Sequence, residues 1–309
     1  MDTVETIILG QDEVARFWAD GALLVRNVMS LEEASSFRNE VESSLSSWIS
    51  QGLVQSTSTG GVLRTDMLSI PLMRKLLLDP RVISLARDLL GNEPVYFGDS
   101  TLSYGCGHRA WHRDNRTSDR GSFHGLDWQG RYPLIRLGLY LQDHKHHSGG
   151  LGIRLRSHLP VTTNPLIHSK ITPTRLRNFL INHTGKAINI DHSYGDIVIW
   201  TLRTLHSAEA VRLKFLPRLR VNPILENIVP HWARLADDGR RMACFMTFAA
   251  SGEHLDRYLA YLQTRDYMVQ IWKNSVWDEQ ALAMANRAGL SVMSKQVAEL
   301  KARHTDKNT

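Results

Sequence analysis

The feature that most constrains the fold is a change in the sequence pattern near residue 94. After this point the chain consists of short apolar runs, rich in β-branched and aromatic residues, that are separated by turn residues. Short runs of this kind are typical of an antiparallel barrel or sandwich. Strands are expected at residues 95–104, 134–141, 151–155, 187–190, 197–201 and 242–248.

The first part of the chain has mostly helical patterns. Residues 12–18 have helical spacing that Gly21 ends, and a short apolar strand is expected at residues 23–25. Ser30 followed by Glu33 is a capping box that predicts a helix start. Another helix is expected at residues 80–90 before Gly91, and a loop at residues 55–61, which are rich in Ser, Thr and Gly.

Helical patterns return after residue 251, with one helix expected after Gly252 and a second from about Asp278 to Arg303. The length of 309 residues fits one domain. We therefore predict a single domain over residues 1–309. Residues 1–93 would form a helical support, residues 94–251 the β core and residues 252–309 C-terminal helices.

Composition excludes several classes of protein. The net charge is +6, but the basic residues are scattered and no nucleic-acid-binding motif is present, so nucleic acid is not expected as a partner. No run approaches 18 apolar residues, so no membrane span is expected. Two cysteines, Cys106 and Cys244, cannot form a disulfide framework, and no leader pattern opens the chain. A cytoplasmic protein is expected.

Three residues form a candidate metal site. His112 and Asp114 are two apart, so in a strand both side chains point to the same face. A later apolar strand at residues 197–201 leads into His206. Two histidines and one carboxylate on one face of a metal leave three coordination positions open, which is the arrangement used by Fe(II) oxygenases.

The order of several motifs resembles the phytanoyl-CoA dioxygenase-like family over nearly the whole chain. The resemblance includes the helix, strand and helix of residues 17–33, the helix ending at Gly91, and the segment Trp111 to Asp114. It continues through a strand pair with Gly149–Gly150 and Ser157–His158, and through the strand that leads into His206. The usual Pro-Gly-Ser-His turn of that family is replaced by residues 155–158, Leu-Arg-Ser-His.

This resemblance implies a double-stranded β-helix, also called a jelly roll or cupin-like fold, with flanking helices. It implies Fe(II) and 2-oxoglutarate as cofactors and dioxygen as co-substrate. The implied reaction couples oxidative decarboxylation of 2-oxoglutarate to hydroxylation of an unactivated C–H bond. The substrate would be a small, possibly anionic, molecule of secondary metabolism, and the protein a monomer or homodimer.

An arginine is also implied, to bind the distal carboxylate of 2-oxoglutarate. We assign it to Arg241, because residues 241–251 resemble the family's final arginine-bearing strand. Arg240, Arg212 and Arg220 remain alternatives. With Arg241 in this role, residues 211–239 are an insertion that covers the active site, forms a dimer contact or is an ordinary surface loop.

Side chains beside the iron motif are candidates for substrate binding. Arg113 and Arg116 have the charge to bind a carboxylate or phosphate, or alternatively to pair with Asp119 or Asp127. Trp111 is a candidate for lining an apolar pocket. The histidines of residues 143–147 resemble a second metal site, but their polar turn context favours a solvated loop.

Other functions of the same fold remain open at this stage. Desaturation and cyclisation are alternative oxidative outcomes. A halogenase would need Gly or Ala in place of Asp114, so this residue argues against halogenation. A non-catalytic ligand-binding protein would be marked by loss of a metal ligand, and all three ligands are present.

Overall fold

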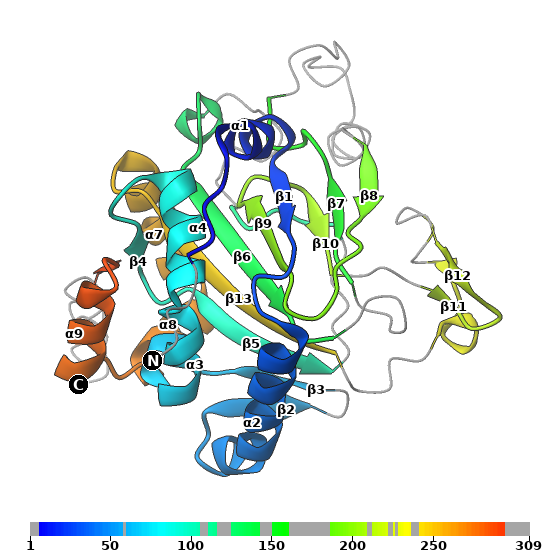
Figure 1. Ribbon diagram of the computed structural model, residues 1–309, viewed down its shortest axis with the longest axis horizontal. Coiled ribbons are helices and arrows are strands. Elements are labelled where there is room, and N and C mark those ends of the chain that lie inside the picture. Colours follow the sequence, from blue (N-terminus) through cyan, green and yellow to red (C-terminus); the bar gives the residue numbers. More distant parts are fainter. Residues whose placement is uncertain are drawn as a thin grey trace.

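The structure, a computed structural model, describes residues 6–57, 60–105, 111–115, 125–142, 150–160, 186–208, 212–221, 225, 228–235 and 241–293. It consists mainly of antiparallel sheet with flanking helices (Figure 1). A large sheet lies between a layer of helices and a smaller sheet. Among the described residues, no helix combines the length and the apolar character needed to cross a membrane.

The large sheet has nine strands among the described residues. Its main path runs in the order β1 (Ala22–Val25), β9 (Ile197–Thr201), β6 (Leu134–Tyr140), β13 (Met242–Ala249), β5 (Ser100–Gly105), β3 (Gly60–Leu63) and β2 (Val54–Thr57). Neighbours on this path are antiparallel. At one edge β4 (Val95–Tyr96) pairs with β13, and β14 (Ser291–Val292) pairs with β4 in parallel.

The smaller sheet has three strands among the described residues, in the order β10 (His206–Ser207), β7 (Gly152–Arg154) and β8 (Ala187–Asn189). A separate hairpin of β11 (Arg212–Leu213) and β12 (Leu216–Arg220) lies beyond this sheet (Figure 1). Its turn exposes Phe215 and Leu216. Between this hairpin and β13 lies a short 3-10 helix, His231–Ala233.

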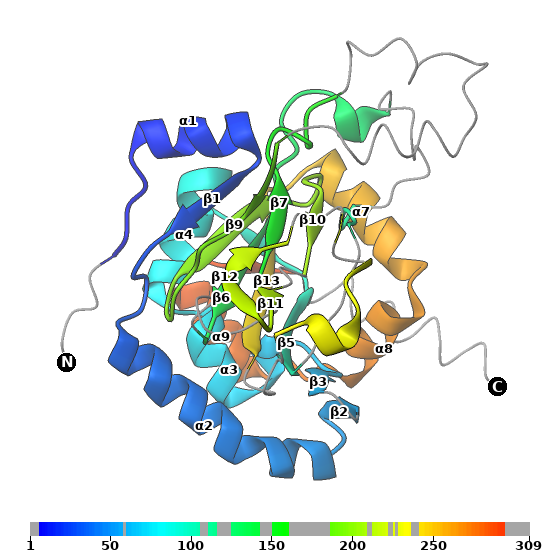
Figure 2. The ribbon, with the colours of Figure 1, turned by 90° about the vertical axis from the view of Figure 1, so that its right-hand side faces the viewer.

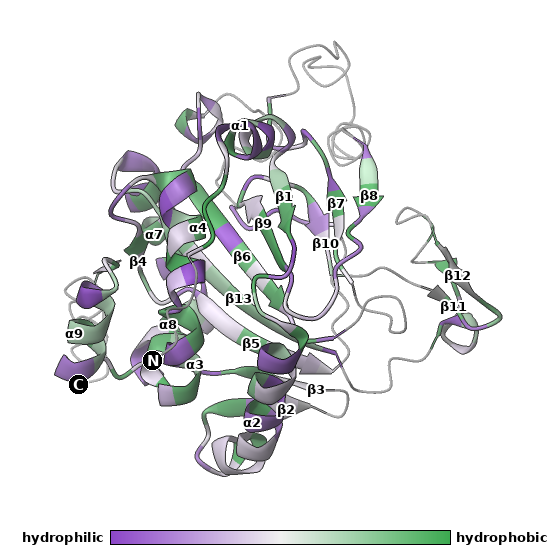
Figure 3. Cartoon of the chain, viewed as in Figure 1, coloured by the Kyte–Doolittle hydropathy of each residue, from purple (hydrophilic) through white to green (hydrophobic). Residues whose placement is uncertain are grey.

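Alternation along the central strands fixes the two faces of the large sheet. On β9, Ile197 and Ile199 pack into the core shared with the helices, whereas Val198 and Trp200 pack against the smaller sheet. This is the two-residue period of a strand that is buried on both sides. The apolar character of β6 and β9 is visible as green along most of their length in Figure 3. The side chains of Val198 and Trp200 therefore face the space between the two sheets.

Helices cover the other face of the large sheet. The core on that side is built with α2 (Leu31–Ser50), α3 (Pro71–Leu77) and α4 (Pro80–Leu90). A separate core at the end of the sheet involves α7 (Glu253–Gln263) and α8 (Asp266–Asn274), which lie away from α1 (Gln11–Asp20) (Figure 2). The C-terminal helix α9 (Glu279–Arg287) packs into the first core through Ala281 and Ala285. Short 3-10 helices span Met67–Ser69 and Leu126–Trp128.

Most of the expected elements are confirmed. The expected strands correspond to β1, β4 with β5, β6, β7, β8, β9 and β13, and the helix at residues 80–90 is α4. The helix start at Ser30 is a capping box, as predicted. The helix expected after Gly252 is α7, and its expected apolar face, Leu255, Tyr258, Leu259 and Leu262, is buried.

Two expectations were wrong. Residues 55–61 are not a loop throughout, because β2 and β3 form a hairpin that pairs with β5. The helix expected from Asp278 to Arg303 is interrupted after Arg287, since Gly289 adopts a left-handed φ of 71° and Ser291 then pairs with β4; residues 294–303 lie outside the described residues. The N-terminal region supplies three strands to the large sheet, of which β1 was expected.

Gly21 connects the end of α1 to the segment that precedes His206. Its φ is 81°, in the left-handed region, and its carbonyl accepts hydrogen bonds from Thr204 Oγ1 at 2.7 Å and the Thr201 amide at 3.1 Å. A Cβ atom at Gly21 would collide with His158 Nδ1 and lie 2.7 Å from Thr204 Oγ1. Only glycine fits both the backbone conformation and this space.

We predict that Gly21→Ala lowers the free energy of unfolding by about 2–5 kcal/mol, the combined cost of left-handed strain and overpacking. Gly52→Ala is the matched control, because Gly52 also has a positive φ, of 73°, but nothing lies within 4 Å of its would-be Cβ. The control should cost only the strain, about 1–2 kcal/mol. Urea unfolding followed by circular dichroism measures both. Equal losses would show that the contacts at Gly21 are unimportant.

Candidate metal site

The turn between β9 and β10 places His206. The backbone of this turn is closed by a hydrogen bond from the Thr204 amide to the Thr201 carbonyl at 2.9 Å, and the two threonine hydroxyls lie 3.1 Å apart. Ser157 Oγ accepts from the Leu205 amide at 2.8 Å, which ties the turn to the smaller sheet. His206 follows directly as the first residue of β10, so its position is fixed by buried backbone contacts.

The segment that carries His112 and Asp114 lies alongside this turn. His112 and His206 exchange two backbone hydrogen bonds, each 2.9 Å, in an antiparallel bridge. The Asp114 amide donates to the Leu202 carbonyl at 3.1 Å. Residues that are far apart in the sequence therefore meet through main-chain pairing, which positions the side chains without relying on their own contacts.

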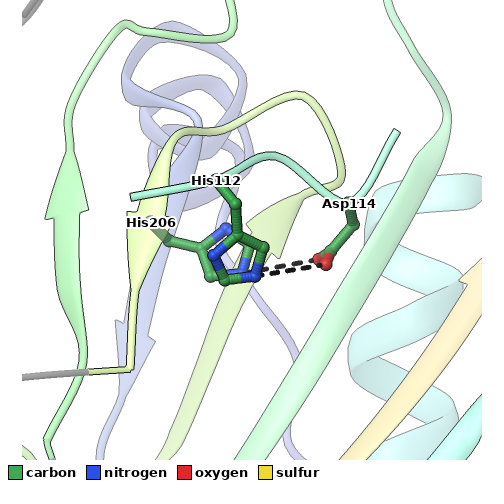
Figure 4. A group of neighbouring side chains, drawn as sticks. All are labelled: His112, Asp114 and His206. Atoms are coloured by element: carbon green, nitrogen blue, oxygen red, sulfur yellow. Dashed lines mark ion pairs between the residues drawn. The ribbon is translucent and has the colours of Figure 1, made fainter. Parts of the chain in front are cut away.

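The three predicted ligands converge. One potential ligand atom each from His112, Asp114 and His206 lies within 4.8 Å of the others. His112 Nε2 is 3.8 Å from Asp114 Oδ1, and His206 Nε2 is 3.6 Å from Asp114 Oδ2. Figure 4 shows the two imidazole rings side by side, with the carboxylate facing them. The His112 side chain is 16% exposed and the other two are less so, so the group lies just below the surface.

The protonation states suit metal binding. Burial lowers the pKa of His206 to about 3, so its imidazole is neutral near pH 7. His206 Nδ1 lies 3.0 Å from the Thr204 carbonyl oxygen, which only accepts, so Nδ1 carries the proton and Nε2 presents its lone pair. That lone pair faces a carboxylate oxygen of Asp114. Two acceptors that face each other in a buried site repel unless a cation lies between them.

Asp114 is ionised despite its burial. Burial alone would raise its pKa, but the Arg136 guanidinium, 3.3 Å from Oδ1, acts together with the two nearby histidines and the Trp200 indole N–H, and these groups hold the pKa well below its usual range. Trp200 Nε1 donates to the other oxygen, Oδ2, at 3.3 Å. The site therefore offers a negative carboxylate together with a neutral imidazole nitrogen.

Arg241 precedes β13 and is 2% exposed. Its Nη1 lies 3.3 Å from Ser103 Oγ on the neighbouring strand β5. By strand alternation it shares the face of Ala243, which packs between the two sheets with Tyr140. The Tyr140 hydroxyl is buried without a hydrogen-bond partner among the described residues, and burial raises its pKa while Arg241 opposes that rise. The Arg241 guanidinium and this Tyr140 hydroxyl thus lie in the same buried region. Together they offer the hydrogen-bond donors that a bound carboxylate would require.

Arg113 lies between the two ligands in sequence and contacts main-chain carbonyls. Its Nε donates to the Arg203 carbonyl at 2.9 Å and its Nη2 to the Ser157 carbonyl at 3.1 Å. Its guanidinium also lies 5.6 Å from the centre of the Trp128 ring. These contacts join the His112 segment to the two turns that hold His206. A substrate-binding role for Arg113 stays a prediction.

The remaining candidates are placed unevenly. Trp111 is half-buried and packs against the Arg154 guanidinium, which lies 5.0 Å from the centre of its ring. Arg212 begins β11. Arg116, Arg240 and residues 143–147 lie outside the described residues. Of the two cysteines, Cys244 is buried in the core as expected, and Cys106 lies outside the described residues.

Sequence reasoning missed the polar side chains that surround the ligands. Arg136 is the clearest case, and a signal for it existed, because it is the one charged residue in the apolar run at residues 134–141. A charge inside such a run is costly unless it is paired. The contact between Trp200 and Asp114 had no comparable signal, because a tryptophan in an apolar strand fits the core equally well.

Comparison with known proteins shows the fold. No protein-family model matches the sequence, and no curated protein matches it either. Among solved structures, EctD from S. alaskensis with bound Fe has a TM-score of 0.53 and 17% identity over 78% of this chain and 77% of its own. SnoK, a non-haem α-ketoglutarate-dependent carbocyclase from nogalamycin biosynthesis, has a TM-score of 0.53 and 17% identity over 78% of this chain and 84% of its own.

A third similar structure is HygX from Streptomyces hygroscopicus with nickel and 2-oxoglutarate bound. Its TM-score is 0.51 with 15% identity, over 79% of this chain and 88% of its own. At these identities the likeness establishes a shared fold. The chain therefore shares the fold of these three proteins, and it also has a candidate metal site of two histidines and one aspartate.

We predict that Arg113→Met lowers the free energy of unfolding by about 2–4 kcal/mol, because two charge-assisted hydrogen bonds to carbonyls are lost. Arg16→Met is the control, since Arg16 is exposed and has only a 3.9 Å ion pair with Glu13. Thermal and urea unfolding provide the measurement. Wild-type stability with weakened substrate binding would instead support the substrate role of Arg113.

Proposed function

We propose that this protein is an Fe(II)- and 2-oxoglutarate-dependent dioxygenase, with iron held by His112, Asp114 and His206. The observation that carries the proposal is the convergence of an ionised carboxylate and a neutral imidazole lone pair, which repel each other without a cation. The second histidine, His112, completes a three-ligand set. Two histidines and a carboxylate on one face are the ligand set of non-haem Fe(II) oxygenases.

The surrounding fold supports this choice of metal and co-substrate. The two facing sheets with flanking helices agree with the double-stranded β-helix of the phytanoyl-CoA dioxygenase-like family, which we propose as the closer affiliation. Similar structures bind Fe, or nickel with 2-oxoglutarate. When bound, iron and 2-oxoglutarate supply the oxidising power, by reducing dioxygen while 2-oxoglutarate is converted to succinate and CO2.

The protein's own side chains would do three things in this reaction. The ligand triad holds the metal on one face and leaves the opposite face for 2-oxoglutarate and dioxygen. Arg241 binds the distal carboxylate through its fork of donors, with Ser103 Oγ and the Tyr140 hydroxyl at hand as further hydrogen-bonding groups. The aromatic side chains of Trp200, Tyr140 and Phe245 fill the space between the sheets and exclude water.

The substrate class is proposed more broadly. We propose a small, possibly anionic, molecule of secondary metabolism, with hydroxylation as the reaction. Proteins of similar structure catalyse different reactions, since SnoK is a carbocyclase and SnoN is an epimerase. The structure of EctD contains 5-hydroxyectoine. Cyclisation or desaturation of a bound substrate is therefore the second candidate. Halogenation is disfavoured because Asp114 occupies the coordination position that a halide would need.

We predict that His112→Ala, Asp114→Ala and His206→Ala each abolish succinate formation and the visible absorption of an anaerobic Fe(II) and 2-oxoglutarate complex. Because the ligands act as a unit, a double variant should lose little more than a single one. His254→Ala is the control, since His254 pairs with Asp127 on another part of the chain. Circular dichroism checks that each variant is folded.

Wild-type protein that gives no such absorption would reject the oxygenase and favour a non-catalytic binding protein. Succinate release at the wild-type rate from any one ligand variant would show that the triad is wrongly drawn. Neither result depends on knowing the primary substrate, because slow uncoupled consumption of 2-oxoglutarate is sufficient for the assay.

We predict that Arg241→Lys weakens 2-oxoglutarate binding by several-fold to hundreds-fold, equivalent to about 1–3 kcal/mol for a lost charge-assisted hydrogen bond. Iron affinity should be nearly unchanged, because the substitution keeps the charge and leaves the triad intact. Arg212→Lys and Arg240→Lys are matched controls with a much smaller expected effect. Anaerobic titration with 2-oxoglutarate gives the Kd. If Arg212→Lys were the variant that weakens binding, residues 211–239 would not be an insertion.

A further inference from the structure

Arg136, on the central strand β6, is an arginine in direct contact with the proposed metal ligand Asp114. Its Nη1 lies 3.3 Å from Asp114 Oδ1, and its side chain is 16% exposed. By strand alternation it faces the space between the sheets, as Tyr140 does on the same strand. An arginine here is costly to bury, so its retention needs an explanation beyond strand formation.

Other groups hold the far side of this guanidinium. Arg136 Nη2 donates to Asp99 Oδ2 at 2.6 Å, and Nε donates to Thr247 Oγ1 at 2.9 Å. Asp99 Oδ2 in turn accepts from the Tyr258 hydroxyl of α7 at 3.1 Å. The guanidinium is thus fixed by Asp99 and Thr247, Asp99 is in turn held by Tyr258, and Nη1 is directed at Asp114.

Asp114 itself depends on such contacts for its orientation. Its segment is described only over residues 111–115 and lies outside the named strands. Arg136 approaches Oδ1 and Trp200 Nε1 approaches Oδ2, so rotation of the carboxylate would break one contact or the other. Partners of this kind orient a metal-binding carboxylate and raise metal affinity.

Simple electrostatics acts in the opposite direction. A positive charge so near a ligand repels a divalent cation, and this repulsion is strong in a buried site. Asp99 offsets much of the charge of Arg136 through their 2.6 Å ion pair. Arg136 therefore offers directed hydrogen-bond donors to Asp114, while its repulsion of a bound metal ion is reduced. Its expected effect is to orient the carboxylate rather than to repel the metal.

We propose that Arg136 is a positioning residue that orients Asp114 for metal binding, with Asp99 and Thr247 holding it in place. The proposal rests on the metal site of the proposed function. It assigns no contact between Arg136 and substrate, and it predicts the sign of the change in metal affinity when Arg136 is replaced.

The test is a titration of the metal-free protein with Co(II) alone, followed by its visible absorption, which also reports the coordination number. Arg136→Met should weaken Co(II) binding by about 10–100-fold, as expected for loss of a group that orients a ligand. Arg136→Lys should also weaken it, by several-fold, because a single ammonium cannot contact Asp99, Thr247 and Asp114 together.

Arg74→Met is the matched control. Arg74 is also buried, donates to the Leu68 carbonyl at 2.8 Å and lies 3.7 Å from Asp278, but it belongs to α3 on the helical side of the large sheet. Its loss should lower the thermal midpoint and leave the Kd for Co(II) unchanged. The comparison separates general destabilisation from an effect on the metal site.

Three results would overturn the proposal. Tighter Co(II) binding by Arg136→Met would show that the residue acts only as a repelling charge. An unchanged Kd with a lowered thermal midpoint would give it a purely structural role. If Arg136→Met does not fold, wild-type Co(II) affinity in Arg136→Lys overturns it instead. Failure of the wild-type protein to bind Co(II) is a different outcome, because it removes the metal site of the proposed function itself.

Discussion

The candidate site depends on the pair of backbone hydrogen bonds between His112 and His206. These bonds bring together two segments that are far apart in the sequence, and they do so at the residues that carry the imidazoles. Main-chain pairing of this kind is insensitive to most side-chain changes. The geometry of the triad therefore depends on how β10 pairs with the segment that carries His112 and Asp114. The remaining contacts refine that geometry.

Side-chain contacts on two sides of the segment that carries His112 and Asp114 refine the geometry of the triad. Arg113 and the candidate ligands on either side of it make separate contacts. Arg113 contacts the carbonyls of Arg203 and Ser157 on one side, and Arg136 contacts Asp114 on the other. A segment with little regular structure is thereby fixed by two arginines. Rigid placement of ligands before the metal arrives reduces the entropy lost on binding.

The strands could be predicted because each depends on local pattern, since apolar runs bounded by turn residues indicate β6, β9 and β13. The grouping of His112, Asp114 and His206, which the structure brings together, was predicted from a His-x-Asp pair, a later histidine and the family resemblance. The errors arose where distant contacts decide the structure. Within the polar stretch that was expected to be a loop, β2 and β3 form a hairpin and β3 pairs with β5, while α9 ends before Ser291 pairs with β4. The charge of Arg136 in an apolar run was a signal that it is paired, but its partners could not be predicted, since Asp99, Thr247 and Asp114 approach it from separate parts of the chain.

The charges around the site connect metal and co-substrate. Arg136 and Arg241 carry two positive charges, and Asp99 and Asp114 carry two negative ones, so these four side chains are balanced by themselves. Fe(II) alone would add two positive charges to a space with low dielectric constant, where uncompensated charge is costly. A 2-oxoglutarate dianion would restore the balance, and Arg241 would bind its distal carboxylate. Under the proposed function, metal and co-substrate should therefore strengthen each other's binding, as coupled ligands must do reciprocally.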